Sequence, residues 1–457
     1  MERQKARIDF TEGKLLKNIF FFSVPMILST VIQLLFNAAD VAVVGRFAGT
    51  VYQSAVGATS STIHLIINLL IGLSIGANIV MATAFGEKDE EKQSRIVHTS
   101  MALAIVGGIA VMFIGIFLSE PLMRLLDTPS DAFEYSVLYM RVYFLGAPAN
   151  IVYNFAASVY RGVGETKRPL YYLFVSGVLN VLINVITVVF FHMHVVGVAL
   201  GTVLSQYVAA IWVIRDLRKE KNGIRYEIKK TRFYKKELRG ILLFGIPTGI
   251  SSCCFSLSNL LIQSSVNAYG STVVAGNTVA VNVDAFIDAF TASIGKATVT
   301  AIGQNVGAKK YRRIRKTMGA GILVSLFCSI CIALFMLLLG KYVYALFNGD
   351  EEVIKIALIR MQFTTMGYTL VGFMEVFGAA LRGLGYSISQ MFVNLTCVCL
   401  FRIFWISWFY PLAPCLEMIY IAYPITWVLS GLAQGIAFLI AERRFKKKVG
   451  VDKSVSM

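Results

Sequence analysis

Long apolar segments, each interrupted by only a few polar residues, recur along the whole chain. A bilayer crossing takes about 20 apolar residues in a helix, and twelve segments reach about that length. They are 16–44, 52–85, 96–118, 133–160, 169–191, 195–214, 241–269, 272–306, 317–339, 353–381, 386–410 and 418–441. Several are longer than one crossing requires, which predicts tilted or kinked helices. The pattern predicts an all-α integral membrane protein with twelve transmembrane helices.

The composition supports a membrane protein and changes the meaning of the charge. Of the 457 residues, 56% are hydrophobic and only 15% are charged, which excludes an ordinary soluble protein of this length. The formal net charge is +17. In a soluble protein such a surplus would suggest nucleic acid, but here the basic residues lie in short connections between apolar segments. We therefore expect membrane lipids and no nucleic acid as partners.

The distribution of Lys and Arg predicts the orientation. Basic residues concentrate at both ends of the chain and in the even-numbered connections, above all in 215–239. Cytoplasmic loops carry an excess of Lys and Arg, so both termini are expected in the cytoplasm. Residues 1–17 are polar and charged, and no cleavable signal peptide is visible.

The chain also repeats itself. Residues 23–25 return as 245–247, and 161–164 (R-G-V-G) return as 382–385 (R-G-L-G). Asn37 returns as Asn259, 222 residues later. Because each half has six segments, an even number, both halves enter the membrane from the same side. Such parallel repeats occur in secondary transporters.

These repeats and the charge pattern predict four regions. An N-terminal six-helix bundle with the ion site covers 1–218, and a basic cytoplasmic linker covers 219–238. A C-terminal six-helix bundle covers 239–442, and a basic cytoplasmic tail covers 443–457.

One acid stands out in the first apolar segment. Gln33, Asn37 and Asp40 fall at helical spacing and share one face. A charge inside a membrane is costly unless it faces a protein interior or a watery cavity. We interpret Asp40 as the residue on which the function depends. The alternative is a structural role near the membrane interface, with Asp40 paired to Arg46.

Polar residues of two other segments lie at a similar depth. At a rise of about 1.5 Å per residue, Asp40 lies about 9 Å, Asn184 about 12 Å and Thr202 about 10 Å from the outer ends of their helices. Asn180 lies one turn before Asn184 on the same face. We expect these side chains to converge, although amides and hydroxyls also bond helices for purely structural reasons.

Such a group can exchange a proton. Removal from water favours the neutral form of a carboxylic acid, so Asp40 can take up a proton outside and release it inside. Neutral Asn and Thr partners can form hydrogen bonds with either form.

Further polar residues are candidates for a substrate cavity. Asp284 and Asp288 are one turn apart in the eighth segment, and Lys296 follows in the same segment. With Gln33 and Asn37, they are predicted to line a cavity that attracts cationic compounds. Alternatively, Lys296 neutralises an acid on another helix.

Three other charges are predicted to be structural. Glu375 and Arg402 are expected to pair with each other. Arg360 lies near the outer end of its segment and is expected to extend its charged group to the membrane surface.

Several motifs resemble a known family. They are S-V-P and N-x-x-D in the first segment, F-G-E-K-D at 85–89, R-G-x-G-E-T-K-R-P at 161–169, and Q-N-V-G-A-K-K at 304–310. The chain is similar to the multidrug and toxic compound extrusion (MATE) family, in its DinF-like branch, within the superfamily that also contains oligosaccharide flippases. The resemblance implies two pseudo-symmetric six-helix bundles that form a V around a central cavity. It also implies a monomer in a prokaryotic inner or plasma membrane that exports small organic compounds by alternating access, in exchange for protons or sodium.

The resemblance also assigns roles to particular residues. Asp40 matches the acid of the first helix, Asn180 the amide of the fifth and Thr202 the hydroxyl of the sixth. Asn184 departs from the branch, which often has Asp there, and this weakens the case for a tight sodium site at Asp40. No other metal and no cofactor are implied.

The absences narrow the alternatives. The sequence contains no G-x-x-x-x-G-K-[ST] loop, so ATP is not expected as the direct energy source. No H-E-x-x-H motif or catalytic cluster is found, so we do not expect an enzyme. The main alternative is a flippase of a lipid-linked oligosaccharide or lipid precursor, which should line its cavity with several cations. A channel is disfavoured by the asymmetric polar residues of the two repeats.

Overall fold

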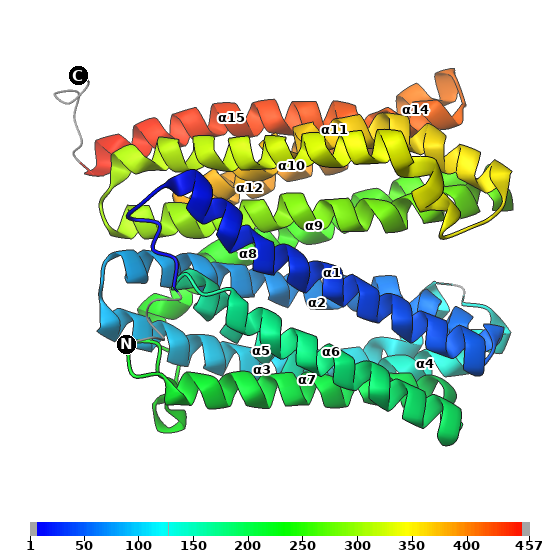
Figure 1. The fold of residues 1–457 in the computed structure, drawn as a ribbon, viewed down its shortest axis with the longest axis horizontal. Coiled ribbons are helices and arrows are strands. Elements are labelled where there is room, and N and C mark those ends of the chain that lie inside the picture. The colour runs from blue at the N-terminus through cyan, green and yellow to red at the C-terminus, as the bar shows by residue number, and fades with distance from the viewer. Residues whose placement is uncertain (1–6, 127, 450–457) are drawn as a thin grey trace. The chain divides into compact units, whose positions relative to one another are not determined.

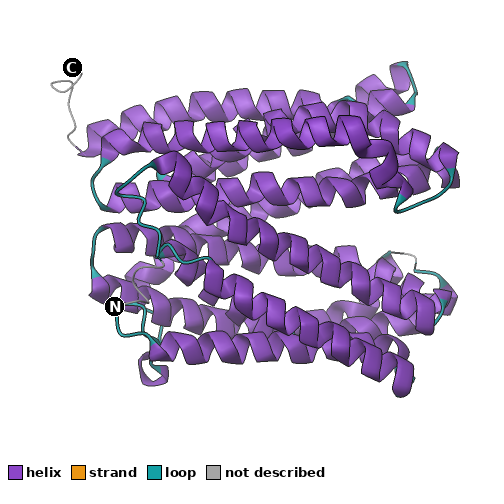
Figure 2. Cartoon of the chain, in the orientation of Figure 1, coloured by secondary structure: helices purple, strands orange, loops and turns teal. Residues whose placement is uncertain are grey.

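The chain is helical throughout the part that the structure covers. The computed structural model describes residues 7–126 and 128–449, apart from the side chains at positions 50, 61, 64, 65 and 366, and no strand occurs among these residues (Figure 2). Ten helical segments within these ranges are long and apolar enough to cross a membrane. The two other predicted crossings correspond to residues 130–162, where the helix is broken, and to residues 351–383, which are more polar. The predicted all-α membrane architecture is confirmed.

The first six crossings are built from seven α-helices (Figure 1). They are α1 (Leu15–Phe47), α2 (Thr50–Gly86), α3 (Glu90–Leu125), α4 (Ser130–Phe144), α5 (Ala147–Gly162), α6 (Lys167–Val185) and α7 (His194–Lys219). A π-helical turn, Ile186–Phe190, extends α6, and a short 3-10 turn, Ile228–Lys230, follows α7.

The second six crossings follow the same order (Figure 1). Their helices are α8 (Lys235–Asn267), α9 (Ser271–Gly307), α10 (Tyr311–Ala345), α11 (Glu351–Gly383), α12 (Ser387–Asn394), α13 (Phe401–Phe404), α14 (Leu416–Tyr420) and α15 (Ala422–Val449). The predicted helix 386–410 is therefore interrupted. Two π-helical stretches, Leu395–Leu400 and Trp405–Phe409, flank α13, and the 3-10 turn Tyr410–Leu412 ends the segment.

The described residues form two compact units. The first unit comprises Leu28–Gly249 with the residues before Asp9, and the second comprises Asp9–Ile27 with the residues from Ile250 onward. The divisions fall inside α1 and α8, close to the helix-interior residues Pro25 and Pro247. A proline inside a helix removes a backbone hydrogen bond and kinks the helix. The units thus divide differently from the predicted domains 1–218 and 239–442.

The backbone repeats as the sequence does. Positive φ angles occur at three pairs of positions, and the members of each pair are 221 residues apart. The pairs are Gly49 and Gly270, Lys88 and Lys309, and Gly164 and Gly385. The same turns therefore follow the first, second and fourth crossings of each half. This supports two pseudo-symmetric six-helix bundles.

The predicted helix 133–160 is broken. α4 ends at Phe144 and α5 begins at Ala147, with Pro148 in its first turn. Proline is tolerated there because the first N–H groups of a helix have no intrahelical partner, whereas inside a continuous helix it removes a bond. Gly146 lies at the break, where an added Cβ would be 2.7 Å from Gln206 Oε1.

Glycines bring α2 and the first part of α8 into close contact within the first unit. A Cβ added to Gly72 would lie 2.3 Å from Gly249 Cα, and one added to Gly76 would lie 2.3 Å from the Ile241 carbonyl oxygen. Small residues at such spacing let membrane helices approach closely. This contact explains why α8 up to Gly249 belongs to the first unit.

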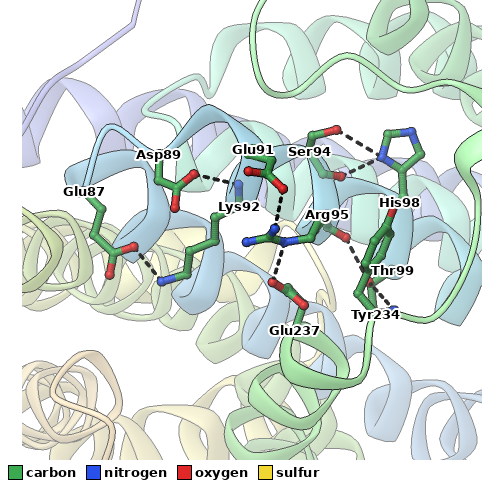
Figure 3. Close-up of polar contacts among 10 residues, drawn as sticks. All are labelled: Glu87, Asp89, Glu91, Lys92, Ser94, Arg95, His98, Thr99, Tyr234 and Glu237. Carbon is green, nitrogen blue, oxygen red and sulfur yellow. Dashed lines mark hydrogen bonds and ion pairs between the residues drawn. The ribbon is translucent and has the colours of Figure 1, made fainter.

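The basic linker is also part of the first unit. His98 of α3 accepts a hydrogen bond from the Glu227 N–H through Nε2 at 3.0 Å. Arg95, one turn earlier, forms ion pairs with Glu237 at 2.9 Å and Glu91 at 2.6 Å (Figure 3). The linker is therefore bound to the beginning of α3.

Two of the recognised motifs hold the N-terminal segment. In the second unit, Gln304 Oε1 accepts from the Phe10 N–H at 2.9 Å, and Asn305 Nδ2 donates to the Phe10 carbonyl at 3.1 Å. In the first unit, the Ile8 N–H donates to the Gly164 carbonyl at 2.9 Å. A Cβ on Gly164 would lie 2.1 Å from the Ile8 carbonyl oxygen, so only glycine fits. The Q-N and R-G-x-G motifs thus have structural roles here.

Candidate functional site

The structure brings the four predicted ion-site residues together in the first unit. Asp40 is 8% exposed, and its Oδ1 accepts a hydrogen bond from Asn184 Nδ2 at 2.5 Å. Thr202 Oγ1 lies 3.5 Å from the other carboxylate oxygen, Oδ2. The Asn180 amide lies between Asp40 and Thr202. The orientation that satisfies both its ends has Nδ2 donating to Asp40 Oδ1 at 2.9 Å and Oδ1 at 3.3 Å from Thr202 Oγ1.

Local structure explains this convergence. Asn180 and Asn184 are one turn apart on α6 and both are buried, so they present two amides on one face. α6 and α7 pack together, and Gly201 of α7 leaves room for Asn184, whose Oδ1 lies where a Cβ would be only 1.9 Å away. Gly177 of α6 likewise leaves room for the Phe36 ring of α1. Two glycines therefore allow three helices to meet at Asp40.

The partners of Asp40 are neutral. Among the residues that the structure describes, no ion pair joins Asp40 to a basic side chain, and the predicted alternative of a pair with Arg46 does not form. Asn184 Oδ1 is buried and accepts no hydrogen bond. No group of three or more His, Cys, Asp or Glu side chains suited to a metal occurs in the described ranges.

The hydrogen bonds define two different oxygens on the carboxyl group. Oδ1 faces two amide donors, so it serves as an acceptor. Oδ2 faces the Thr202 hydroxyl, which also lies 3.1 Å from the Val198 carbonyl of its own helix. A hydroxyl can both donate and accept. The site can therefore satisfy Asp40 whether or not Oδ2 carries a proton.

Two aromatic residues near this site were missed in the sequence. Tyr139 and Tyr143 of α4 lie near Asp40, and Tyr139 is buried. Their spacing of one turn was visible in the sequence, but the break between α4 and α5 sets where this face points. Because 133–160 was expected to form one helix with no break at a defined position, no signal tied these tyrosines to Asp40.

The predicted cavity residues have different surroundings. Gln33 and Asn37 are exposed on the part of α1 that belongs to the first unit, Asp288 of α9 is exposed in the second unit, and Lys296 is half-buried. Asp284 is buried and paired with Arg360, whose Nη2 and Nε lie 3.0 and 3.2 Å from Oδ2. Asp284 therefore has its charge neutralised inside the unit, which differs from its predicted role of attracting cations.

Two predictions about the other charges are wrong. Arg360 does not reach the membrane surface: it is buried, donates to Asn277 Oδ1 at 2.5 Å and pairs with Asp284. Glu375 pairs with Arg382 at 3.5 Å rather than with Arg402. Both errors arise because depth along a helix says nothing about which side of the helix a residue occupies.

A comparison with family models identifies the chain's relatives. The MatE model matches twice, over residues 25–186 and 247–406, which together make up most of the chain. The chain belongs to the MatE family. The two matches also coincide with the two sequence repeats. In this MatE protein, Asp40 lies within the first matched region and Arg402 within the second.

Curated relatives of this MatE protein cover most of its length. It is 27% identical over 81% of the chain, and 81% of the relative, to "Probable multidrug resistance protein YoeA" from Bacillus subtilis (strain 168). It is 23% identical over 82% of the chain, and 83% of the relative, to "Multidrug export protein MepA" from Staphylococcus aureus (strain MSSA476).

Solved structures share the fold. A MATE protein in complex with MaL6 superposes with a TM-score of 0.89, at 20% identity, covering 96% of this chain and 99% of the other. A MOP superfamily transporter from Pyrococcus furiosus Vc1 (DSM3638) gives 0.86 at 21% identity, covering 96% and 97%. These similarities establish the MatE fold of a multi-pass membrane protein.

Proposed function

We propose that this MatE protein is a secondary active exporter of small organic compounds, driven by the inward movement of a cation that binds at Asp40. The observation that carries the proposal is a buried carboxylate inside a membrane helix bundle, held only by neutral partners in the described structure. The names of the curated relatives, a multidrug resistance protein and a multidrug export protein, support export as the activity.

The neutral partners favour exchange of the ion. A carboxylate in a membrane is costly unless a proton or cation neutralises it. A fixed Arg or Lys would neutralise Asp40 permanently and remove its tendency to bind an ion. Amides and a hydroxyl stabilise the charge partly and leave this tendency in place. Asp40 is therefore suited to bind an ion on one side of the membrane and release it on the other.

The geometry favours a proton over sodium. Asn184 turns its nitrogen toward Asp40 Oδ1, and Asn180 does the same in the orientation that satisfies both ends of its amide. In that arrangement the side-chain oxygens available to a cation are the carboxylate and Thr202 Oγ1. Cations such as sodium need several oxygen ligands, which would require at least one amide to turn over. A proton on Oδ2 needs only the Thr202 hydroxyl as acceptor.

Helix α1 connects ion binding to conformational change. Its part from Leu28 carries Asp40 and belongs to the first unit, while Asp9–Ile27 belongs to the second unit. Pro25 lies near the division and weakens the helix there. Neutralising Asp40 changes its hydrogen bonds to α6 and α7, and we propose that α1 then bends or repacks near Pro25 in an alternating-access cycle.

We also propose that both termini lie in the cytoplasm and that the protein acts as a monomer. The basic linker and the basic loops at the same end of the helices support this orientation. A single cysteine introduced in the linker of a variant that lacks the seven native cysteines tests it. In intact and in lysed cells, an impermeant thiol reagent should label this cysteine only after lysis.

Transport into inverted vesicles tests the main proposal. Wild-type vesicles should accumulate ethidium, a fluorescent organic cation, when a proton gradient is imposed, and ethidium should in turn release protons. Asp40→Asn should abolish both signals, whereas Asp131→Asn, at an exposed acid of α4, should keep them. Undiminished ethidium uptake by Asp40→Asn would reject Asp40 as the coupling residue.

Two further arms separate the alternatives. If the coupling ion is a proton, a sodium gradient imposed at fixed pH should not drive ethidium uptake. Transbilayer movement of a fluorescent lipid, measured in the same vesicles, should not depend on Asp40. Lipid movement that requires Asp40 while ethidium uptake is absent would favour a flippase.

A further inference from the structure

The second unit contains a buried cation without a counterion. Arg402 of α13 is 0% exposed, and its Nη2 has no hydrogen-bond partner. Nη1 donates to Asn259 Oδ1 at 2.8 Å and to Ser258 Oγ at 3.1 Å, and Nε donates to Thr426 Oγ1 at 3.3 Å. All these acceptors are neutral.

The surrounding side chains do not neutralise this charge either. The guanidinium lies over the rings of Tyr423 and Phe255, at 4.5 and 5.5 Å from their centroids. The charged or titratable side chains near Arg402 in the described structure are Tyr423, Arg360 and Cys399, none of them an acid. Arg360 adds a second positive charge, although its own charge is neutralised by Asp284. A buried cation without an anion is strongly unfavourable.

The region around Arg402 carries a buried charge of the opposite sign to that in the corresponding region of the first unit. At the offset of 221 residues that relates the turns at Gly164 and Gly385, Arg402 corresponds to Val181, the residue after Asn180. In the first unit this region holds a buried anion with neutral partners, and in the second it holds a buried cation with neutral partners. π-helical stretches, Leu395–Leu400 and Trp405–Phe409, lie on both sides of Arg402. Such turns occur frequently at functional sites.

We propose that Arg402 is the centre of an oxyanion-binding site that takes the carboxylate, or the chemically similar phosphate group, of a transported solute or of a lipid. This inference rests on the proposed function and adds to it a substrate class, compounds that carry a negative group. Asn259 is the entrance to the site, because its side chain is exposed while its Oδ1 occupies one donor of the buried guanidinium.

The chemistry of the guanidinium fits this ligand. Arg presents its N–H donors in a planar fork that matches the two oxygens of a carboxylate or phosphate. Nη2 is free, and Nη1 becomes available when the Asn259 amide moves aside. Ser258 adds a hydroxyl that can donate to an anion. An anion would therefore complete the hydrogen bonding and neutralise the charge at once.

Equilibrium binding of a matched pair of probes tests the proposal. The full-length protein is placed in phosphatidylcholine nanodiscs without any ion gradient, and the fluorescence of dansylglycine, a carboxylate, is compared with that of its neutral amide, dansylglycinamide. Loss of hydrogen bonds to a charged group weakens binding about 10- to 100-fold. The wild type should therefore prefer dansylglycine by a factor in this range.

Two variants examine the site from opposite directions. Arg402→Gln removes the charge and should abolish the preference for dansylglycine. Asn259→Asp, which is nearly isosteric, places a carboxylate at the acceptor already 2.8 Å from Nη1. It should raise the melting temperature and also abolish the preference, while dansylglycinamide binding stays unchanged. If Arg402→Gln does not fold, Asn259→Asp still carries the test.

Some outcomes would overturn the inference. Equal binding of the two probes to the wild type would do so, and so would a preference that survives in Asn259→Asp. A higher melting temperature for Asn259→Asp with unaltered probe binding would make Arg402 a purely structural cation. Adding phosphatidylglycerol to the nanodiscs identifies the source of the anion: displacement of dansylglycine points to a lipid phosphate, and continued binding points to a solute.

The result is independent of ion coupling. Because the binding is measured without a gradient, a failure of Asp40-dependent export leaves the probe preference intact. Conversely, a missing preference for dansylglycine leaves ethidium export by the proposed mechanism intact. The two proposals can therefore fail separately.

Discussion

Substituting Gly201 by alanine should disturb the Asp40 site without touching Asp40. The added Cβ would lie 1.9 Å from Asn184 Oδ1, whereas an ordinary carbon–oxygen contact is roughly 3.2 Å or more. Asn184 must therefore move by about 1.3 Å or more. If Asn184 moves directly away, its 2.5 Å bond to Asp40 lengthens to about 3.8 Å, which is too long for a hydrogen bond.

The size of the effect follows from this bond. A hydrogen bond to a charged group stabilises the folded protein by about 1.5–3 kcal/mol. Replacing glycine by alanine inside a helix increases the stability by up to about 1 kcal/mol. The net loss of stability should be about 1–2 kcal/mol, seen as a lower melting temperature in detergent. Proton-driven ethidium uptake should fall with it, because the displaced amide no longer holds Asp40 against α6.

A double-mutant cycle isolates the contact. In an Asn184→Ala background the obstructing oxygen is gone, so Gly201→Ala should no longer destabilise the protein. Gly57→Ala is the matched control, since a Cβ there meets no atom within 4 Å, and it should be neutral or slightly stabilising. Equal effects of Gly201→Ala in the two backgrounds would refute the reasoning.

Three further substitutions test the packing around the sites. Arg360→Met should destabilise the protein by about 3–5 kcal/mol because it leaves the Asp284 carboxylate buried and unpaired. The melting temperature should recover when Asp284→Asn is added. If it does not recover, the loss of stability does not come from this ion pair. Gly72→Leu should prevent the close contact of α2 with α8 and lower the yield of folded protein in size-exclusion chromatography. A normal elution profile would contradict the importance of this contact. His98→Phe leaves the Glu227 N–H without its acceptor, which should lower the stability of the protein by about 1–3 kcal/mol. Protease cleavage of the linker should increase. Unchanged cleavage would show that this bond does not hold the linker.

The crossing segments were predictable because a bilayer imposes a minimum apolar length. The repeats at 161–164 and 382–385 likewise predicted two related halves, and the backbone repeats its positive φ angles at Gly164 and Gly385. The break between α4 and α5 had a signal in Pro148, which the apolar pattern alone did not use. Excess apolar length predicts that some helices are tilted or kinked, but it does not locate the residue at which a helix breaks.

The candidate ion site was predictable in part. The sequence predicts a similar depth for Asp40, Asn184 and Thr202, with Asn180 one turn before Asn184. The structure places Asn180, Asn184 and Thr202 within hydrogen-bond distance of Asp40. The atomic roles were not predictable: which carboxylate oxygen faces the amides and which faces the hydroxyl depends on rotamers. These are set by neighbours such as Gly201, whose missing side chain allows the close approach.

The sequence alone determined that this chain crosses a membrane many times, that its halves are related and that a lone acid lies in its first crossing. Apolar length, repetition and residue type can all be read along the chain without knowing how its helices pack. The tertiary structure alone decided which charges are neutralised. Arg360 meets Asp284 and Glu375 meets Arg382, while Arg402 meets no acid among the described residues. Pairing depends on the rotation of each helix about its axis, and that rotation is set by packing with distant helices rather than by the position of a residue along its own segment.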